Sequence, residues 1–273
     1  MTAPPVDIPD ADRRAPLPAL ASIAAVAGFQ LARLLTPPRL ALAAIGIVFP
    51  TAVLAAAVNG IGTSIEPRLG IPMLYLLIPE MVCMLGLLVT MSPLVADELE
   101  RGTWVHVAVR PGGRRGLLLG TWLAAVIWSG AVALAALALA ILSDCIEGGS
   151  RVAGTFAVLI LLSCMGRAAL FALPAVIVPK RALVASVGVA LVIEYLAGLI
   201  PAVVNQFTVS LRLRTLLVAW TGLRRDIPAE FQLLVDINRP WYQVSAVLVL
   251  TAVFLAIAWA ILEWRQFPPS DES

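Results

Sequence analysis

LVADELERGTWVHVAVRPGGRR, residues 94–115, is a dense polar and charged segment set between two long apolar runs. Acids stand near its start and arginines close it after a Pro-Gly-Gly turn, an order that the dipole of one or two short helices favours. Polar connections between membrane helices lie in water, so residues 96–115, here called the handle, are predicted to be a cytosolic connection. The simplest interpretation is an ordinary positively charged cytosolic loop, for which the arginines are sufficient.

Composition places the chain among polytopic membrane proteins. Of its 273 residues, 60% are hydrophobic and only 13% are charged, and the mean hydropathy is +0.95. These values lie well outside the range of soluble domains. Nineteen basic residues stand against 17 acidic ones, and they form no stripe apart from the apolar segments, which argues against a nucleic-acid-binding protein.

Six apolar runs are long enough to cross a bilayer, which takes about 20 mostly apolar residues each. These runs are residues 40–58, 71–95, 117–142, 152–178, 182–203 and 241–262. The predicted fold is therefore an all-α membrane protein with six transmembrane helices. Ahead of them, residues 19–36 carry apolar side chains at helical spacing and are predicted to form an amphipathic helix in the membrane interface.

The remaining segments are polar. Residues 1–18 are rich in proline and charge, which predicts a disordered cytosolic tail without a cleavable signal peptide. Residues 204–240 are predicted to be a long external segment that could contain an amphipathic or re-entrant helix, and residues 266–273 a short cytosolic tail.

The basic residues predict the orientation, because cytosolic loops carry an excess of them. They gather before the first span, in the handle and in the turn at residues 179–181. Both termini are therefore expected in the cytosol. The external segment opposes this rule with five arginines, but six spans place it outside. The excess of arginine over lysine and of alanine is typical of GC-rich bacteria, so we expect a bacterial cell membrane.

Three ionisable residues, Glu80, Arg167 and Glu194, fall inside spans, where each costs about 2.5–3.5 kcal/mol at the bilayer centre. Arg167 and Glu194 lie about thirteen residues before and after the turn at residues 179–181, and therefore at the same depth, about 20 Å from it. The spacing predicts an ion pair between them, as a structural lock or as part of a transport pathway. Glu80 has no cation that the sequence assigns to its depth, so it is protonated or lines a pathway.

Chemical motifs of enzymes and metal sites are absent from the sequence. There is no P-loop, because the single lysine, Lys180, follows Val-Pro, and there is no zinc-protease, nucleophile-elbow or dinucleotide motif. His106 has no second histidine, and the three cysteines are widely spaced, so we expect buried thiols and no metal. The chain is predicted to be neither an enzyme nor the carrier of a cofactor.

Within the handle, the pattern E-x-E-R-G-T at residues 98–103, then an apolar stretch and R-P-x-x-R at residues 110–114, resembles the loop after the second membrane helix of ABC-2-type permeases. The order of interfacial helix, six spans, charged second connection and long last external segment is similar to the same family, whose architecture is that of type V exporters.

The resemblance implies a coupling helix that docks on a separate ATPase subunit, which would hydrolyse the ATP. The implied coupling residues are Asp97, Glu98, Glu100, Arg101, Gly102 and Thr103. It also implies a homodimer or a heterodimer with a second permease, and export of a hydrophobic or amphipathic substrate. Two alternatives stay open: a proton-coupled secondary transporter that uses Glu80 or Glu194, and a non-transporting membrane anchor subunit.

Overall fold

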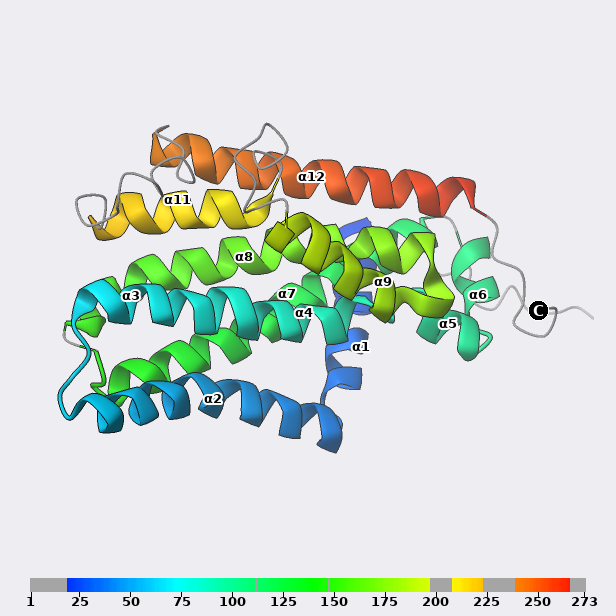
Figure 1. Cartoon of the computed structure of the whole chain (residues 1–273). Coiled ribbons are helices and arrows are strands. Elements are labelled where there is room, and N and C mark those ends of the chain that lie inside the picture. The colour runs from blue at the N-terminus through cyan, green and yellow to red at the C-terminus, as the bar shows by residue number, and fades with distance from the viewer. Residues whose placement is uncertain (1–18, 111, 147, 197–207, 223–238, 266–273) are drawn as a thin grey trace, which may run out of the picture.

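The computed structural model describes residues 19–110, 112–146, 148–196, 208–222 and 239–265, and every regular element among them is a helix. Five helices are long and apolar enough to cross a membrane, and they run side by side (Figure 1). They are Pro37–Gly60, Pro67–Glu100, Gly113–Leu142, Gly149–Ile177 and Pro240–Trp264. The predicted class of all-α membrane protein is therefore confirmed.

The second of these spans is not a uniform helix. It consists of α3 (Pro67–Tyr75), the π-helical stretch η1 (Leu76–Val82) and α4 (Cys83–Met91). Pro79 lies inside η1, where it lacks the N–H that a regular helix would use. Proline and π-helical turns both interrupt the regular ladder, so this span presents backbone oxygens to its neighbours in mid-helix.

The four other membrane-spanning candidates follow the expected spans more closely. α2 covers Pro37–Ile61, α7 Gly113–Leu142, α8 Gly149–Ile177 and α12 Pro240–Trp264. α8 is the central helix, because 72% of its most apolar window is buried, against 11% for the first span and 17% for the last. The first and last spans thus present most of their surface outward, and α8 is enclosed by protein.

The expected fifth span, residues 182–203, is described only as far as Leu196. After the short helix η2 (Pro179–Arg181), the chain forms α9 (Ala182–Val189) and the π-helical stretch η3 (Ala190–Leu196), and residues 197–203 lie outside the described part. α9 packs on the half of α8 that ends near the handle (Figure 1). The described portion is too short to cross a bilayer by itself.

The segment expected to be external contains α11 (Val209–Thr221), which packs against α8 and α12. Figure 1 shows it beside the half of α8 opposite to α9. Arg212 of this helix is buried, donates from Nη1 to Gln243 Oε1 at 2.8 Å and lies over the Tyr242 ring. The flanking residues 204–207 and 223–238 lie outside the described part.

α1 (Ala19–Leu34) has 16 residues and crosses the long helices at a steep angle while packing on α7 (Figure 1). The close approach depends on Gly120 of α7. A Cβ atom at this position would lie 2.6 Å from Val26 Cγ1 and 3.1 Å from the Ile23 carbonyl oxygen. Only glycine therefore fits where α1 crosses.

A Gly120→Val substitution is expected to push α1 off α7 and to destabilise the protein by about 1–3 kcal/mol, the usual cost of overpacking. The matched control is Gly154→Val on α8, where an added Cβ meets nothing within 4 Å. Thermal unfolding in detergent measures both. Equal melting temperatures for the two variants would contradict the close packing of α1.

Candidate functional site

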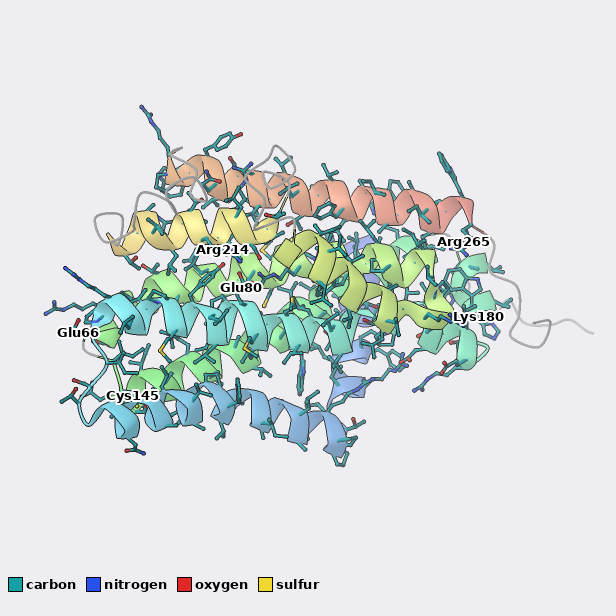
Figure 2. The ribbon with its side chains drawn as sticks, in the orientation of Figure 1. Glu66, Glu80, Cys145, Lys180, Arg214 and Arg265 are labelled. Carbon is teal, nitrogen blue, oxygen red and sulfur yellow. The ribbon has the colours of Figure 1, made fainter. Side chains whose placement is uncertain are left out.

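The two ends of the bundle serve as landmarks for the polar residues. Lys180 and Arg265 lie at one end and Glu66 and Cys145 at the other, with Glu80 between them inside the bundle (Figure 2). The handle lies at the end marked by Lys180, which we call the handle end (Figure 1). The polar residues therefore form two separate sets: a buried set around Glu80 and the handle itself.

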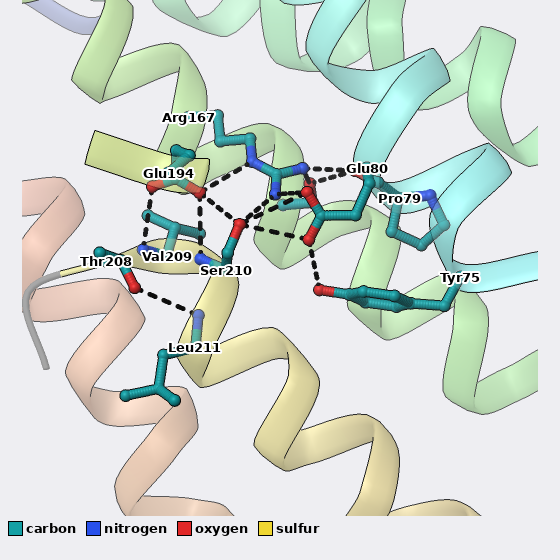
Figure 3. A network of polar contacts seen from close by, with 10 residues as sticks. Tyr75, Pro79, Glu80, Arg167, Glu194, Thr208, Val209, Ser210 and Leu211 are labelled. Carbon is teal, nitrogen blue, oxygen red and sulfur yellow. Dashed lines mark hydrogen bonds and ion pairs between the residues drawn. The ribbon is translucent and has the colours of Figure 1, made fainter. Parts of the chain in front are cut away.

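The buried set is centred on Arg167 of α8 and is here called the polar cluster (Figure 3). Its members come from four different parts of the chain, and none has more than 6% of its surface exposed. They are Tyr75, Glu80, Ser163, Arg167, Glu194 and Ser210. Such burial requires every polar atom to find a partner inside the protein.

Arg167 lies between two carboxylates. Its Nη2 is 2.5 Å from Glu80 Oε2 in η1, and its Nε is 3.4 Å from Glu194 Oε2 in η3. Both acids thus sit in π-helical stretches, which recur at functional sites in proteins. The guanidinium joins two interrupted helices to the central one.

The remaining donors of Arg167 are also satisfied. Nη1 donates to the Pro79 carbonyl oxygen at 2.5 Å and to Ser163 Oγ at 2.9 Å, and Nη2 donates to Ser210 Oγ at 2.8 Å. Ser163 in turn donates to the same Pro79 oxygen at 2.9 Å. The interrupted second span therefore supplies a backbone acceptor as well as a carboxylate.

Glu194 also caps the start of α11. Its Oε1 accepts from the Val209 amide and its Oε2 from the Ser210 amide, both at 3.1 Å, and Ser210 Oγ donates to Oε2 at 2.6 Å. A carboxylate at a helix N-terminus is stabilised by the free amides and by the helix dipole. Glu194 therefore connects the end of the described fifth span to α11, across the residues 197–207 that lie outside the described part.

The charges of the cluster do not balance one to one. Two carboxylates share one guanidinium, and the extra acid is compensated by the amides at the start of α11 and by Tyr75, whose hydroxyl donates to Glu80 Oε1 at 2.7 Å. Ser210 Oγ also lies 3.2 Å from Glu80 Oε1. The arrangement can hold helices together, and a shift of α11 would change the environment of both acids at once.

The ion pair between Arg167 and Glu194 that the sequence predicts is present. The pairing of Glu80 is a correction, since this acid has a cation at its own depth. Ser163 lies one turn before Arg167 on the same helix face, a spacing that indicates a shared partner. Tyr75 and Ser210 carry no comparable signal in the sequence.

The handle forms two short helices, α5 (Ala96–Glu100) and α6 (Trp104–Val109). Gly102 has φ +69°, the left-handed conformation that glycine adopts without steric cost. The Thr103 amide bonds to the Glu98 oxygen and the Gly102 amide to the Leu99 oxygen, at 3.0 and 3.1 Å. This pair of bonds is a Schellman motif, so Gly102 ends α5 and turns the chain into α6.

The inner face of the handle is attached to α1. Arg33 Nη2 lies 2.7 Å from Asp97 Oδ2, and Arg33 Nη1 lies 3.0 Å from Glu98 Oε1. Glu98 is buried and also accepts a short hydrogen bond from Thr103 Oγ1. Of the residues that the resemblance assigns to ATPase contact, Glu98 therefore faces into the protein, and Asp97 is engaged by α1.

The outer face of the handle is exposed. Glu100, Arg101 and Gly102 are exposed, and Val105 and Val109, four residues apart on α6, have 57% and 78% of their surfaces exposed. Residues four apart lie on one helix face. A small apolar strip bordered by charges therefore points away from the bundle at the handle end.

Two arginines fasten the handle end of the long helices. Arg114 Nη1 donates to the carbonyl oxygens of Leu262 and Glu263 at the end of α12, at 3.0 and 2.7 Å, and its guanidinium lies over the Trp104 ring. Arg265 donates to the carbonyl oxygens of Val176 and Ile177 at the end of α8. Cations at helix C-termini satisfy free carbonyls and complement the dipole.

The described residues contain no cluster of metal-ligating side chains. Among them, no three His, Cys, Asp or Glu side chains are grouped closely enough to hold a metal ion. Cys83, Cys145 and Cys164 are buried free thiols, as the sequence indicated. His106 lies exposed on α6.

Comparison with known proteins finds no significant relative of the chain. No protein-family model matches the chain, no curated protein matches it significantly, and no solved structure matches it significantly. The function is therefore inferred from the residues of the polar cluster and of the handle.

Proposed function

We propose that this chain is the membrane-spanning permease subunit of an ATP-driven exporter and that a separate ATPase subunit binds its handle. The two-sided handle carries the proposal. One side is ion-paired to α1 through Arg33, and the other exposes Val105 and Val109 beside Glu100 and Arg101. An exposed apolar strip with a charged border is the composition of a protein-docking surface.

A movement of the handle would reach most of the bundle. Arg33 links it to α1, which packs on α7, and Arg114 links the start of α7 to the end of α12. The polar cluster would hold η1, η3 and α11 against α8 until that movement shifts α11. Residues 182–203 would complete a sixth span in the type V exporter-like architecture. The outward faces of α2 and α12 would meet lipid or a second permease, in a homodimer or a heterodimer. The cargo would be hydrophobic or amphipathic.

The test is capture of the ATPase subunit from the native membrane. The tagged chain is purified in mild detergent and copurifying proteins are identified by mass spectrometry. An Arg101→Glu, Val105→Glu variant, changed only at exposed positions, is expected to lose a Walker-motif ATPase that the wild-type chain retains. Losing contacts on such a docking face costs about 2 kcal/mol or more, which is about thirtyfold in affinity.

The matched control is Arg151→Glu, which reverses an exposed charge at the opposite end of the bundle. It is expected to retain the ATPase. If the wild-type chain captures no ATPase in several detergents, or if the handle variant captures as much as wild type, the coupling function is wrong.

The polar cluster favours a second candidate, a proton-coupled secondary transporter. Two carboxylates, each in a π-helical stretch, share one guanidinium, and interrupted helices with buried acids are the usual form of ion-coupled sites. Flux that collapses with an uncoupler but survives ATP depletion would favour this candidate. Absence of flux with any partner would indicate a non-transporting anchor subunit.

A further inference from the structure

A groove on the outside of the bundle runs between α2, α4 and α7 and has a volume of about 340 Å³. Its lining is almost wholly apolar and includes Leu42, Ile45, Phe49, Leu85 and Val132. Leu42, Ile45 and Phe49 are exposed, so the groove opens to the surroundings of the bundle. In a membrane, those surroundings are acyl chains.

The groove extends over one leaflet. Along α2 it begins at Arg39 in the first turn and ends at Phe49, ten residues later, which is about 15 Å at the helical rise. The hydrocarbon core of a bilayer is about 30 Å thick. The groove therefore reaches from the handle end to about the middle of the membrane.

The handle end of the groove is cationic. A second, smaller cavity shares Leu34, Arg39 and Thr90 with it and adds Gln30, Arg33 and Asp97. Arg33 is paired with two acids, whereas Arg39 donates to the Arg33 carbonyl oxygen at 3.1 Å. Among the described residues, no carboxylate lies within ion-pair distance of Arg39, so its charge is open to an external anion.

We propose that this groove binds one acyl chain of an anionic phospholipid from the leaflet on the handle side, with the lipid phosphate held by Arg39. The length of the groove matches the acyl chain, and guanidinium groups hold phosphate through paired hydrogen bonds. One basic residue near the surface contributes about fivefold to the affinity for an anionic over a zwitterionic lipid. The site does not depend on the proposed transport function.

Trp128 of α7 lines the groove and provides the measurement. The full chain is reconstituted in phosphatidylcholine vesicles that contain a phospholipid with brominated acyl chains, which quench nearby tryptophans. The signal of Trp128 is the difference between the wild-type chain and a Trp128→Phe variant. We expect half-quenching at an about fivefold lower fraction of brominated phosphatidylglycerol than of brominated phosphatidylcholine.

Variants separate the headgroup contact from the groove. Arg39→Gln is expected to abolish the headgroup preference, Arg39→Lys to keep most of it, and Arg181→Gln, which removes an exposed charge at the same end, to leave it unchanged. Ala43→Phe fills the groove and should reduce quenching by both lipids, whereas Ala44→Phe, exposed and outside the lining, should not.

Equal quenching by the two lipids in the wild-type chain, or a preference that persists in Arg39→Gln, would overturn the proposal. The two Arg39 variants keep the test decisive if Ala43→Phe does not fold. Failure of ATPase capture would leave this result untouched, because the lipid measurement uses the chain alone.

Discussion

Replacement of Arg167 by methionine is expected to remove most of the folded protein. The substitution leaves Glu80 and Glu194, each 1% exposed, without the cation that faces both. Breaking a buried ion pair by removing one partner costs about 3–5 kcal/mol, since an uncompensated charge stays buried. That cost is a large fraction of the stability of an ordinary domain.

The structure also predicts which compensating changes rescue the protein. An Arg167→Met, Glu194→Gln double variant should recover little of the folded fraction. Glu80 would still lack the guanidinium that lies 2.5 Å from it in the wild-type chain. The triple variant with Glu80→Gln added should recover most of the folded fraction, because no buried charge is left unpaired. A lock composed of Arg167 and Glu194 alone predicts the opposite, namely full rescue by the double variant.

Fluorescence-detected size-exclusion chromatography and thermal unfolding in detergent measure these folded fractions. Arg151→Met is the matched control, because it removes an exposed arginine from the same helix and is expected to change stability by no more than about 0.5 kcal/mol. Wild-type behaviour of Arg167→Met would show that the polar cluster contributes little to folding.

The sequence predicts the ion pair between Arg167 and Glu194 because the short turn between them fixes their relative depth. Arg167 and Glu194 lie on either side of a three-residue turn, and equal spacing from a tight turn sets equal depth. Glu80 is separated from Arg167 by the whole handle and two spans, so its depth cannot be counted along the chain. The π-helical stretch at residues 76–82 further shifts the face on which Glu80 lies.

Hydropathy predicts the five long helices well, because composition reports whether a stretch tolerates lipid. It does not report where a helix is interrupted, as it is at the π-helical stretches η1 and η3. Hydropathy also leaves α11, which carries Arg212 and Arg214, outside the six apolar runs. Arg212 Nη1 donates to Gln243, which lies 31 residues away and cannot be inferred from a window of local sequence.

The handle is a second region where the sequence predicts the segment but not the contacts of its side chains. Its motif marks the right segment, but three charged side chains on a five-residue helix give no indication of which side faces the protein. That assignment requires Arg33, more than sixty residues earlier in the chain. The sequence does not link Arg33 to the handle, and the structure shows it to be the contact between α1 and the handle.

Reversal of this charge by Arg33→Glu is expected to release the handle from α1. The new acid would face Asp97 and Glu98, and repulsion would replace two ion pairs of 2.7 and 3.0 Å. The two pairs should not contribute equally. The Glu98 side chain is 8% exposed and that of Asp97 27%, so Glu98→Gln should destabilise this contact by a few kcal/mol and Asp97→Asn by about 0.2–1 kcal/mol.

Spin labels on cysteines introduced at Ala32 and Glu100, both exposed, report the separation of α1 and the handle by pulsed electron resonance. The native cysteines are buried, which favours selective labelling of the introduced pair. A narrow distance distribution is expected for the parent chain and for Arg101→Glu, an exposed charge reversal on the same handle. A broad distribution is expected for Arg33→Glu, because α1 then keeps only its packing on α7. If that distribution stays narrow, the packing around Gly120 is sufficient to hold α1, and a force on the handle would pass to α7 without Arg33.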